Sequence, residues 1–236
     1  MIKYPMKNNI NADKVKELFD AELHLGHKKN RTHPNAKKFI YKTENGVSII
    51  DLTITLKQIN DAKEYLNESL KENKTVLVIA TKKVASKITS SLCEHLGLPY
   101  ITTKWPPGLL TNFDTIIKNI EKLKELKKER DLGNWNKMLK HERVFLNKQM
   151  LKLEKFYGGL ISLDKKPEIL IVLDTKKEKN AVKEAGQKNV VVVGIIDTNS
   201  DPDEVKYPIV ANDDSPKAVE YLMNELIDGI KLKIKK

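Results

Sequence analysis

Almost entirely apolar runs of five or six residues alternate with amphipathic helical segments along this chain, and this alternation constrains the fold more than any other feature. The three clearest runs cover residues 75–80, 169–173 and 190–195. Strands that are apolar on both faces are typical of parallel sheets covered by helices on both sides. Because connections between such strands are right-handed, the sequence predicts an α/β fold: an open parallel sheet between two layers of helices.

Apolar residues at helical spacing fill the gaps between these runs. The predicted helices cover about residues 13–23, 53–72, 84–96, 178–188 and 216–227. Two shorter strands are predicted at residues 100–102 and 209–211. The turn Glu44-Asn45-Gly46 lies between two short apolar segments and predicts a small hairpin near the start of the chain.

A long interruption divides the alternating pattern, because the sixty or so residues before the run at 169–173 carry no strand signal. Two helices are predicted there, with a turn at Gly133 and an end at Gly158-Gly159. Apolar residues of the second helix follow a heptad spacing. We therefore expect residues 112–158 to form an inserted antiparallel coiled-coil hairpin, and residues 1–111 and 159–236 to form the sheet domain with its N-terminal helix and basic loop.

The charge of the chain indicates a polyanionic partner. Its 236 residues include 43 Lys plus Arg and 32 Asp plus Glu, a formal net charge of +11, which usually means nucleic acid or an anionic surface. Aromatic residues make up only 6%, so phosphate contacts are favoured over base stacking. One cysteine, Cys93, fits a reducing cytosol, and the sequence predicts neither membrane insertion nor export.

Two basic segments stand out. No acidic residue lies between Leu25 and Thr43, where five Lys and one Arg are placed, and residues 113–158 carry twelve Lys or Arg against seven Asp or Glu. For a single helix, a solvated charged face is the ordinary interpretation. A protruding basic arm together with a basic loop makes nucleic-acid binding an interpretation of equal standing.

The ends of the predicted strands carry few residues that indicate catalysis. Thr81-Lys82-Lys83 follows the first long strand without a glycine-rich phosphate loop. Asp197, Asp201 and Asp203, three carboxylates within seven residues, have the oxygen ligands that Mg²⁺ requires, but a loop folded by side-chain hydrogen bonds to backbone amides is the favoured interpretation of 197–203. His24 and His27 have a spacing compatible with two metal ligands, yet local hydrogen bonds or phosphate contacts are the more usual role of such a pair.

Several segments in order resemble the S-two family of small-subunit ribosomal proteins, in its bacterial type, over nearly the whole chain. His24-Leu25-Gly26-His27 resembles the family's His-x-Gly-His motif, and Thr81-Lys82 its Thr-Lys pair. Trp105, Gly108 and Leu110-Thr111-Asn112 match a second motif, in which Lys104 stands for Arg and Pro106-Pro107 for Leu-Gly. The most specific matches are Asp197-Thr198-Asn199-Ser200-Asp201-Pro202 and Asn212-Asp213-Asp214.

The resemblance implies a flavodoxin-like sheet with a coiled-coil insertion, and a structural role in translation on the small (30S) subunit of the cytoplasmic ribosome. It implies no catalysis and no cofactor. The implied partners are ribosomal RNA, neighbouring ribosomal proteins and, in many bacteria, ribosomal protein one. The residues predicted to bind RNA are Lys28, Lys29, Arg31, Lys37, Lys38, Lys82, Lys83, Lys104, Trp105, Thr111 and Asn112.

Two other classes of function are open alternatives. A nucleotide- or Mg²⁺-dependent enzyme acting on RNA would use Asp174, Asp197 and Asp201 at the sheet edge. A coiled-coil adaptor would depend on residues 113–158 and not on Lys28 or Lys38. The enzyme predicts binding of Mg²⁺ or nucleotide to the isolated protein, and the adaptor predicts loss of partner binding when the helical arm is deleted.

Overall fold

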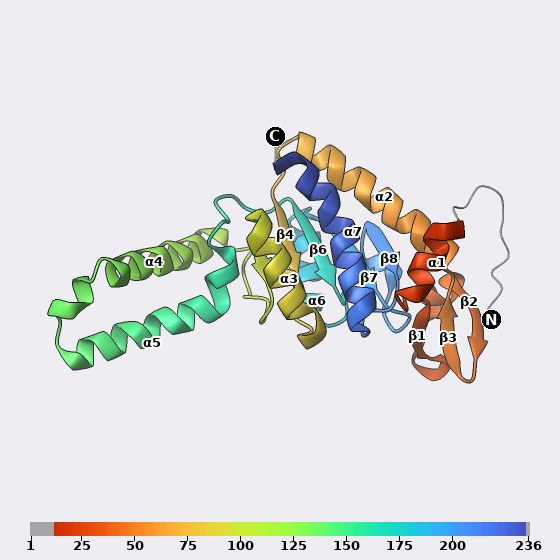
Figure 1. Cartoon of the computed structure of the whole chain (residues 1–236), viewed down its shortest axis with the longest axis horizontal. Helices are drawn as coiled ribbons and strands as arrows, with labels where there is room; N and C mark the ends of the chain where they lie inside the picture. The colour runs from red at the N-terminus through yellow and green to blue at the C-terminus, as the bar shows by residue number, and fades with distance from the viewer. Residues whose placement is uncertain (1–11, 235–236) are drawn as a thin grey trace.

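A five-stranded parallel sheet forms the centre of the molecule (Figure 1). The computed structural model describes residues 12–234, with side chains up to residue 227, so the chain start considered for export lies outside the described part. The strands lie in the order β5-β4-β6-β7-β8, which matches the 2-1-3-4-5 order of flavodoxin. Their bounds are Val76–Ile79 for β4, Tyr100–Ile101 for β5, Ile169–Leu173 for β6, Val191–Ile196 for β7 and Tyr207–Val210 for β8.

Helices cover both faces of this sheet, which confirms the predicted three layers. One face carries α2 (Leu52–Lys71), α3 (Lys83–Leu96) and α7 (Pro216–Ile234), and the other carries α6 (Lys179–Gln187) (Figure 1). Side chains alternate along each strand, so the layer of α7 receives Ile169, Ile171 and Leu173, whereas the layer of α6 receives Leu170 and Val172. This alternation explains why the strands are apolar at every position.

A second, antiparallel sheet of three strands packs beside the first, in the order β1-β3-β2. The predicted hairpin is confirmed by β2 (Ile40–Glu44) and β3 (Val47–Ile50), joined at Asn45-Gly46, where both residues have positive φ. The third strand, β1 (Leu25–Lys28), was not predicted. It follows α1 (Ala12–Asp20) and precedes two short 3₁₀ helices, η1 (Lys29–Arg31) and η2 (Pro34–Phe39).

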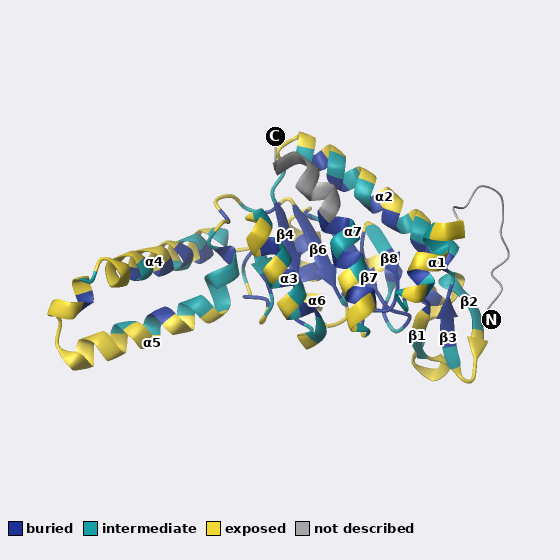
Figure 2. Cartoon of the chain, in the orientation of Figure 1, coloured by how far each residue is buried: buried dark blue, intermediate teal, exposed yellow. Residues whose placement is uncertain are grey.

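Two helices extend from the sheet domain toward the left of Figure 1. They are α4 (Phe113–Asp131) and α5 (Lys140–Tyr157), connected by η3 (Asn134–Lys137), and η4 (Gly158–Leu160) leads back to β6. They share a small apolar cluster made by Leu123, Leu126, Trp135 and Met150. The outer surface of the pair is exposed over most of its length (Figure 2). Within residues 12–234, no helix is both long and apolar enough to cross a membrane.

Candidate functional site

The carboxyl ends of β4 and β6 form the place where flavodoxin-like proteins bind their ligands, and in this chain a lysine occupies it. Lys82 follows β4, and its Nζ lies 2.7 Å from Asp213 Oδ1, 2.8 Å from Asp214 Oδ1 and 3.1 Å from Asp174 Oδ2. The Lys82 side chain is only 15% exposed. A lysine paired with three aspartates therefore lies at the end of the sheet where flavodoxin-like proteins bind their ligands.

The electrostatics of this cluster follow from burial and from an excess of carboxylates. Burial and repulsion from Asp197 raise the pKa of Asp213 to about 7, against the attraction of Lys82. Burial opposes the charge of Lys82, but the attraction of Asp213 and its neighbours outweighs it and raises the pKa of this lysine. Lys82 therefore stays charged while it is surrounded by protein groups.

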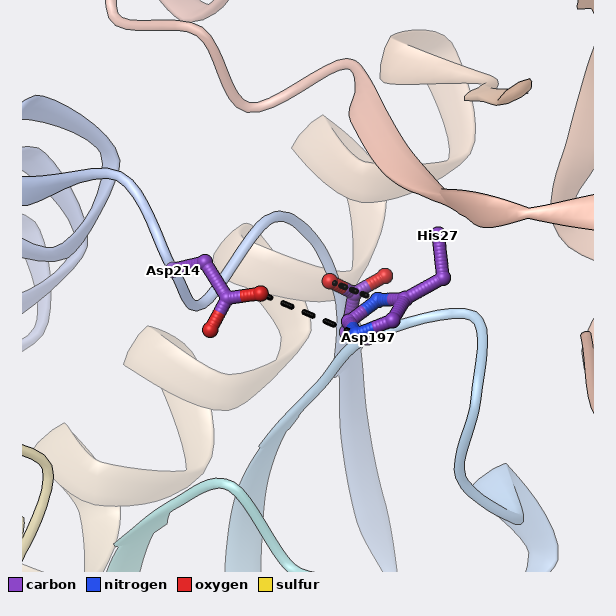
Figure 3. Close-up of side chains that lie close together, drawn as sticks. All are labelled: His27, Asp197 and Asp214. Carbon is purple, nitrogen blue, oxygen red and sulfur yellow. Dashed lines mark ion pairs between the residues drawn. The ribbon is translucent and has the colours of Figure 1, made fainter. Parts of the chain in front are cut away.

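His27 reaches the same cluster from the small sheet (Figure 3). Its Nδ1 lies 2.8 Å from Asp197 Oδ2, and its Nε2 lies 3.7 Å from Asp214 Oδ2 and 3.0 Å from Asn199 Nδ2. The hydrogen bond to Asp197 is the largest influence on His27 and raises its pKa despite burial. His27, Asp197 and Asp214 form the group of possible metal ligands within the described residues.

His24 does not join His27 in this group. Its ring stacks on Phe19 with the centroids 4.1 Å apart, and burial lowers its pKa. The Nδ1 atom of His24 is buried without a hydrogen-bond partner among the described residues. The two histidines suggested by their spacing as metal ligands therefore occupy different environments.

The loop after β7 is folded by its own side chains, as the loop interpretation of residues 197–203 expects. Asp197 accepts hydrogen bonds from the backbone and hydroxyl of Thr198. Asp201 Oδ1 accepts from the Asp203 amide and from Asn35 Nδ2, each at 3.0 Å. Carboxylates used in this way are satisfied by donors of the chain itself.

Thr198 is the point at which the small sheet docks on the large one. Its Oγ1 accepts a hydrogen bond from the His27 amide at 2.9 Å, and its carbonyl accepts one from the His33 amide at 2.7 Å. Gly26 lies so close that an added Cβ would meet Thr198 Cγ2 at 2.6 Å. Two sequence motifs about 170 residues apart thus form one interface, which spacing along the chain does not reveal. The only feature of the local sequence that could have indicated this close approach is Gly26, which lies between His24 and His27.

The basic loop, residues 28–38, presents its cations to solvent. Lys28, Lys29, Arg31 and Lys37 are exposed, and none of the four has an ion-pair partner in the described part of the chain. Lys38 differs, because its Nζ lies 2.8 Å from Asp203 Oδ1 in an exposed pair. The loop therefore carries four free positive charges on one short segment, held in place by η1 and η2.

The segment before α4 is held by one carboxylate, Glu184 of α6. Its oxygens accept hydrogen bonds from Trp105 Nε1 at 3.0 Å, the Gly108 amide at 2.9 Å, the Leu110 amide at 3.1 Å and Thr111 Oγ1 at 3.4 Å. Trp105 is 4% exposed. Burial of Glu184 is outweighed by these donors, so its pKa is lowered.

The other predicted residues of this region lie at the surface. Asn112 is exposed, and its Oδ1 accepts a hydrogen bond from Thr115 Oγ1 at 2.9 Å. Lys83 and Lys104 are exposed and lack ion-pair partners among the residues described. The predicted RNA-binding residues thus divide into exposed cations, the exposed polar residues Thr111 and Asn112, a surface ion pair at Lys38, and the more enclosed residues Lys82 and Trp105.

Replacing Glu184 by Gln should destabilise the protein by ~1–2 kcal/mol, because an amide nitrogen would then face hydrogen-bond donors. The pKa of Glu184 is lowered in the folded state, so its contribution is present above the unfolded pKa and is lost as pH falls through the folded value. Urea unfolding at neutral and acidic pH measures both effects. Glu220→Gln, at an exposed position of α7, is the control. An equal loss of stability in both variants would contradict the role of Glu184.

Comparison with known proteins identifies the family. The sequence model described as "Ribosomal protein S2" matches residues 18–232. The chain is 41% identical over 216 residues to the "Small ribosomal subunit protein uS2" of Coprothermobacter proteolyticus, covering 92% of this chain and 81% of that protein. The match spans the basic loop, all strands of the large sheet, and both helices of the arm. This chain therefore belongs to the ribosomal protein S2 family.

Proposed function

We propose that this chain, a structural component of the small ribosomal subunit, binds ribosomal RNA mainly through phosphate contacts made by the basic loop. The observation that carries the proposal is the set of four unpaired exposed cations, Lys28, Lys29, Arg31 and Lys37. Phosphate contacts position a protein on RNA without reading bases, and folded RNA presents a phosphate-lined surface. The S2 family is a family of structural ribosomal proteins, so the enzyme alternative is not retained.

The contacts within the protein support a narrower RNA-binding set than the sequence predicted. Lys83 and Lys104 are two further exposed cations, and neither is paired within the described residues. Thr111 and Asn112 stay in the proposed set as exposed polar groups. Lys82 and Trp105 support the fold instead, since Lys82 is largely enclosed by three aspartates and Trp105 is buried against Glu184. To bind RNA, Lys38 would have to break its ion pair with Asp203 and pair with a phosphate.

The helical arm is proposed to be a coiled-coil insertion, residues 112–158, on a sheet domain formed by 1–111 and 159–236. The shared cluster of Leu123, Leu126 and Met150 supports this division. Exposed apolar side chains at Val144, Phe145 and Leu151 of α5 favour contact with a neighbouring ribosomal protein, since exposed apolar patches mark interaction sites. Contact with ribosomal protein one in the cytoplasmic ribosome stays a prediction.

Salt dependence tests the RNA proposal. If about six phosphates are neutralised, the affinity for small-subunit RNA should fall with a log–log salt slope of about 4–5. Replacing Lys28, Lys29, Arg31 and Lys37 together by Ala should reduce that slope by about 3, because roughly 0.7–0.9 of slope is lost per contact. Filter binding across a salt series measures it.

A matched control removes four lysines of the arm, Lys118, Lys122, Lys128 and Lys148, which are likewise exposed. This variant has the same change in net charge, so a general effect of charge would lower both slopes equally. A near-flat slope for the unaltered protein, or equal slopes for the two variants, would contradict the proposal. Loss of binding only in the arm variant would favour the coiled-coil adaptor.

A further inference from the structure

The group around His27 combines an imidazole with four carboxylates, which outnumber the cations paired with them. Lys82 is shared by Asp174, Asp213 and Asp214, and His27 faces Asp197 and Asp214. Four carboxylates thus meet one ammonium and one imidazole at the edge of a sheet. This imbalance favours a further cation, and the imidazole nitrogen favours a transition metal over Mg²⁺.

We propose that His27, Asp214 and Asn199 form a binding site for one divalent transition-metal ion of the zinc class, with Asp197 orienting the histidine. The site goes beyond RNA binding and does not depend on it. One nitrogen of His27 and one carboxylate oxygen each from Asp197 and Asp214 lie within 4.8 Å of one another. The residues come from β1, from the loop after β7 and from the loop after β8 (Figure 3).

The distances fit an ion between His27 and Asp214. His27 Nε2 and Asp214 Oδ2 are 3.7 Å apart. Two ligands at tetrahedral positions around Zn²⁺, each about 2.0–2.2 Å from the ion, are separated by roughly 3.4 Å. A shift of a few tenths of an ångström therefore brings both atoms to bonding distance. The other oxygen of Asp214 stays with Lys82, so binding does not break that pair.

Asp197 sets the histidine in the form that binds metal. It lies 2.8 Å from Nδ1 and is almost fully buried, so it holds the proton on Nδ1 and leaves the lone pair on Nε2. A carboxylate behind a metal-binding histidine has this role in many metal sites. The Nε2 lone pair faces Asn199 Nδ2 at 3.0 Å and lies 3.7 Å from Asp214 Oδ2, so it becomes available to an ion beside Asp214 once the Asn199 amide rotates.

Asn199 supplies a third ligand after rotation of its amide. Its Nδ2 is 3.0 Å from His27 Nε2, and its Oδ1 accepts a hydrogen bond from Ser200 Oγ at 2.8 Å. Rotating the Asn199 amide by half a turn exchanges its oxygen and its nitrogen. The oxygen then faces the ion, and the nitrogen donates a hydrogen bond to the Ser200 hydroxyl. The fourth position faces an open pocket of about 450 Å³ that His27 and Asp214 line, so water can reach the ion.

Zinc titration of the full-length chain, without a histidine tag and after treatment with chelator, tests the proposal. We expect one Zn²⁺ per chain, weakened at least tenfold by Asp214→Asn and by His27→Gln. X-ray absorption of the zinc complex should show one imidazole among oxygen ligands. Asp214 is 61% exposed, so Asp214→Asn should fold even if His27→Gln does not, and circular dichroism checks this.

Two controls separate this site from surface binding. His141→Gln removes an exposed histidine of α5, and Asp203→Asn removes an exposed aspartate that pairs with a lysine, as Asp214 does. Both should keep the affinity for Zn²⁺. The proposal is overturned if the unaltered chain shows no saturable binding, if folded Asp214→Asn binds as tightly, or if His141→Gln weakens binding equally.

Discussion

Replacing Lys82 by Met is expected to destabilise the fold by ~3–5 kcal/mol at neutral pH, the usual cost of removing one partner from a buried ion pair. The ammonium is the cation shared by Asp174, Asp213 and Asp214. Without it, carboxylates that are partly or fully buried would repel one another. Chemical unfolding by urea, followed by circular dichroism, measures the loss.

The loss of stability caused by Lys82→Met should be smaller near pH 5 than at neutral pH. The pKa of Asp213 is about 7 in the folded protein and about 3.9 in an unfolded chain. Between these values the folded state binds more protons, so the contribution of Asp213 to stability decreases as pH rises. Removing Lys82 raises this folded pKa further, and the Lys82→Met variant should therefore recover part of its stability near pH 5.

Lys83→Met is the matched control, because Lys83 is the next residue and is exposed. Surface substitutions of this kind usually change stability by no more than about 0.5 kcal/mol. Equal effects at residues 82 and 83, or a loss at Lys82 that does not change between pH 5 and pH 8, would show that Lys82 does not hold the carboxylates together.

The pattern of apolar residues was sufficient to predict the large sheet. The runs at 75–80, 169–173 and 190–195 became β4, β6 and β7, because a strand buried on both faces leaves the same signature wherever it occurs. The predicted hairpin was also confirmed, since the Asn-Gly turn is a local signal. The strand β1 was missed, because its residues Leu25–Lys28 have no strand pattern of their own and are ordered by pairing with β3.

The site was less predictable because its contacts join distant parts of the chain. Lys82 and Lys83 look alike in the sequence, yet Lys82 comes before the first turn of α3 and turns inward, whereas Lys83 is exposed. Trp105 is held by Glu184, 79 residues away. Likewise, His27 meets Asp197 only after the small sheet has docked. Rules of residue spacing predict contacts within one helix or strand, whereas Trp105 and Glu184, like His27 and Asp197, lie on different elements.

The docking contact itself gives the last prediction: Gly26→Val should destabilise the protein by ~3 kcal/mol, the upper end of the cost of overpacking. A Cβ at residue 26 would lie 2.6 Å from Thr198 Cγ2, 2.8 Å from Thr198 Oγ1 and 3.0 Å from the Ser48 carbonyl oxygen. Thr198 cannot easily move aside, because its hydroxyl is bonded to the His27 amide and to Asp197. The basic loop follows directly after this contact, so RNA affinity should fall with stability.

Two comparisons show whether the contact with Thr198 is the cause. Gly186→Val in α6, where a Cβ meets nothing within 4 Å, should change stability by no more than ~0.5 kcal/mol, because helix propensity is then the main difference. Thr198→Ala removes both crowding side-chain atoms, so the double variant with Gly26→Val should be at least ~1 kcal/mol more stable than the sum of the single losses predicts. Strict additivity would mean that valine at residue 26 costs as much without the Thr198 side chain as with it, and that Gly26 is required for some reason other than its close approach to Thr198.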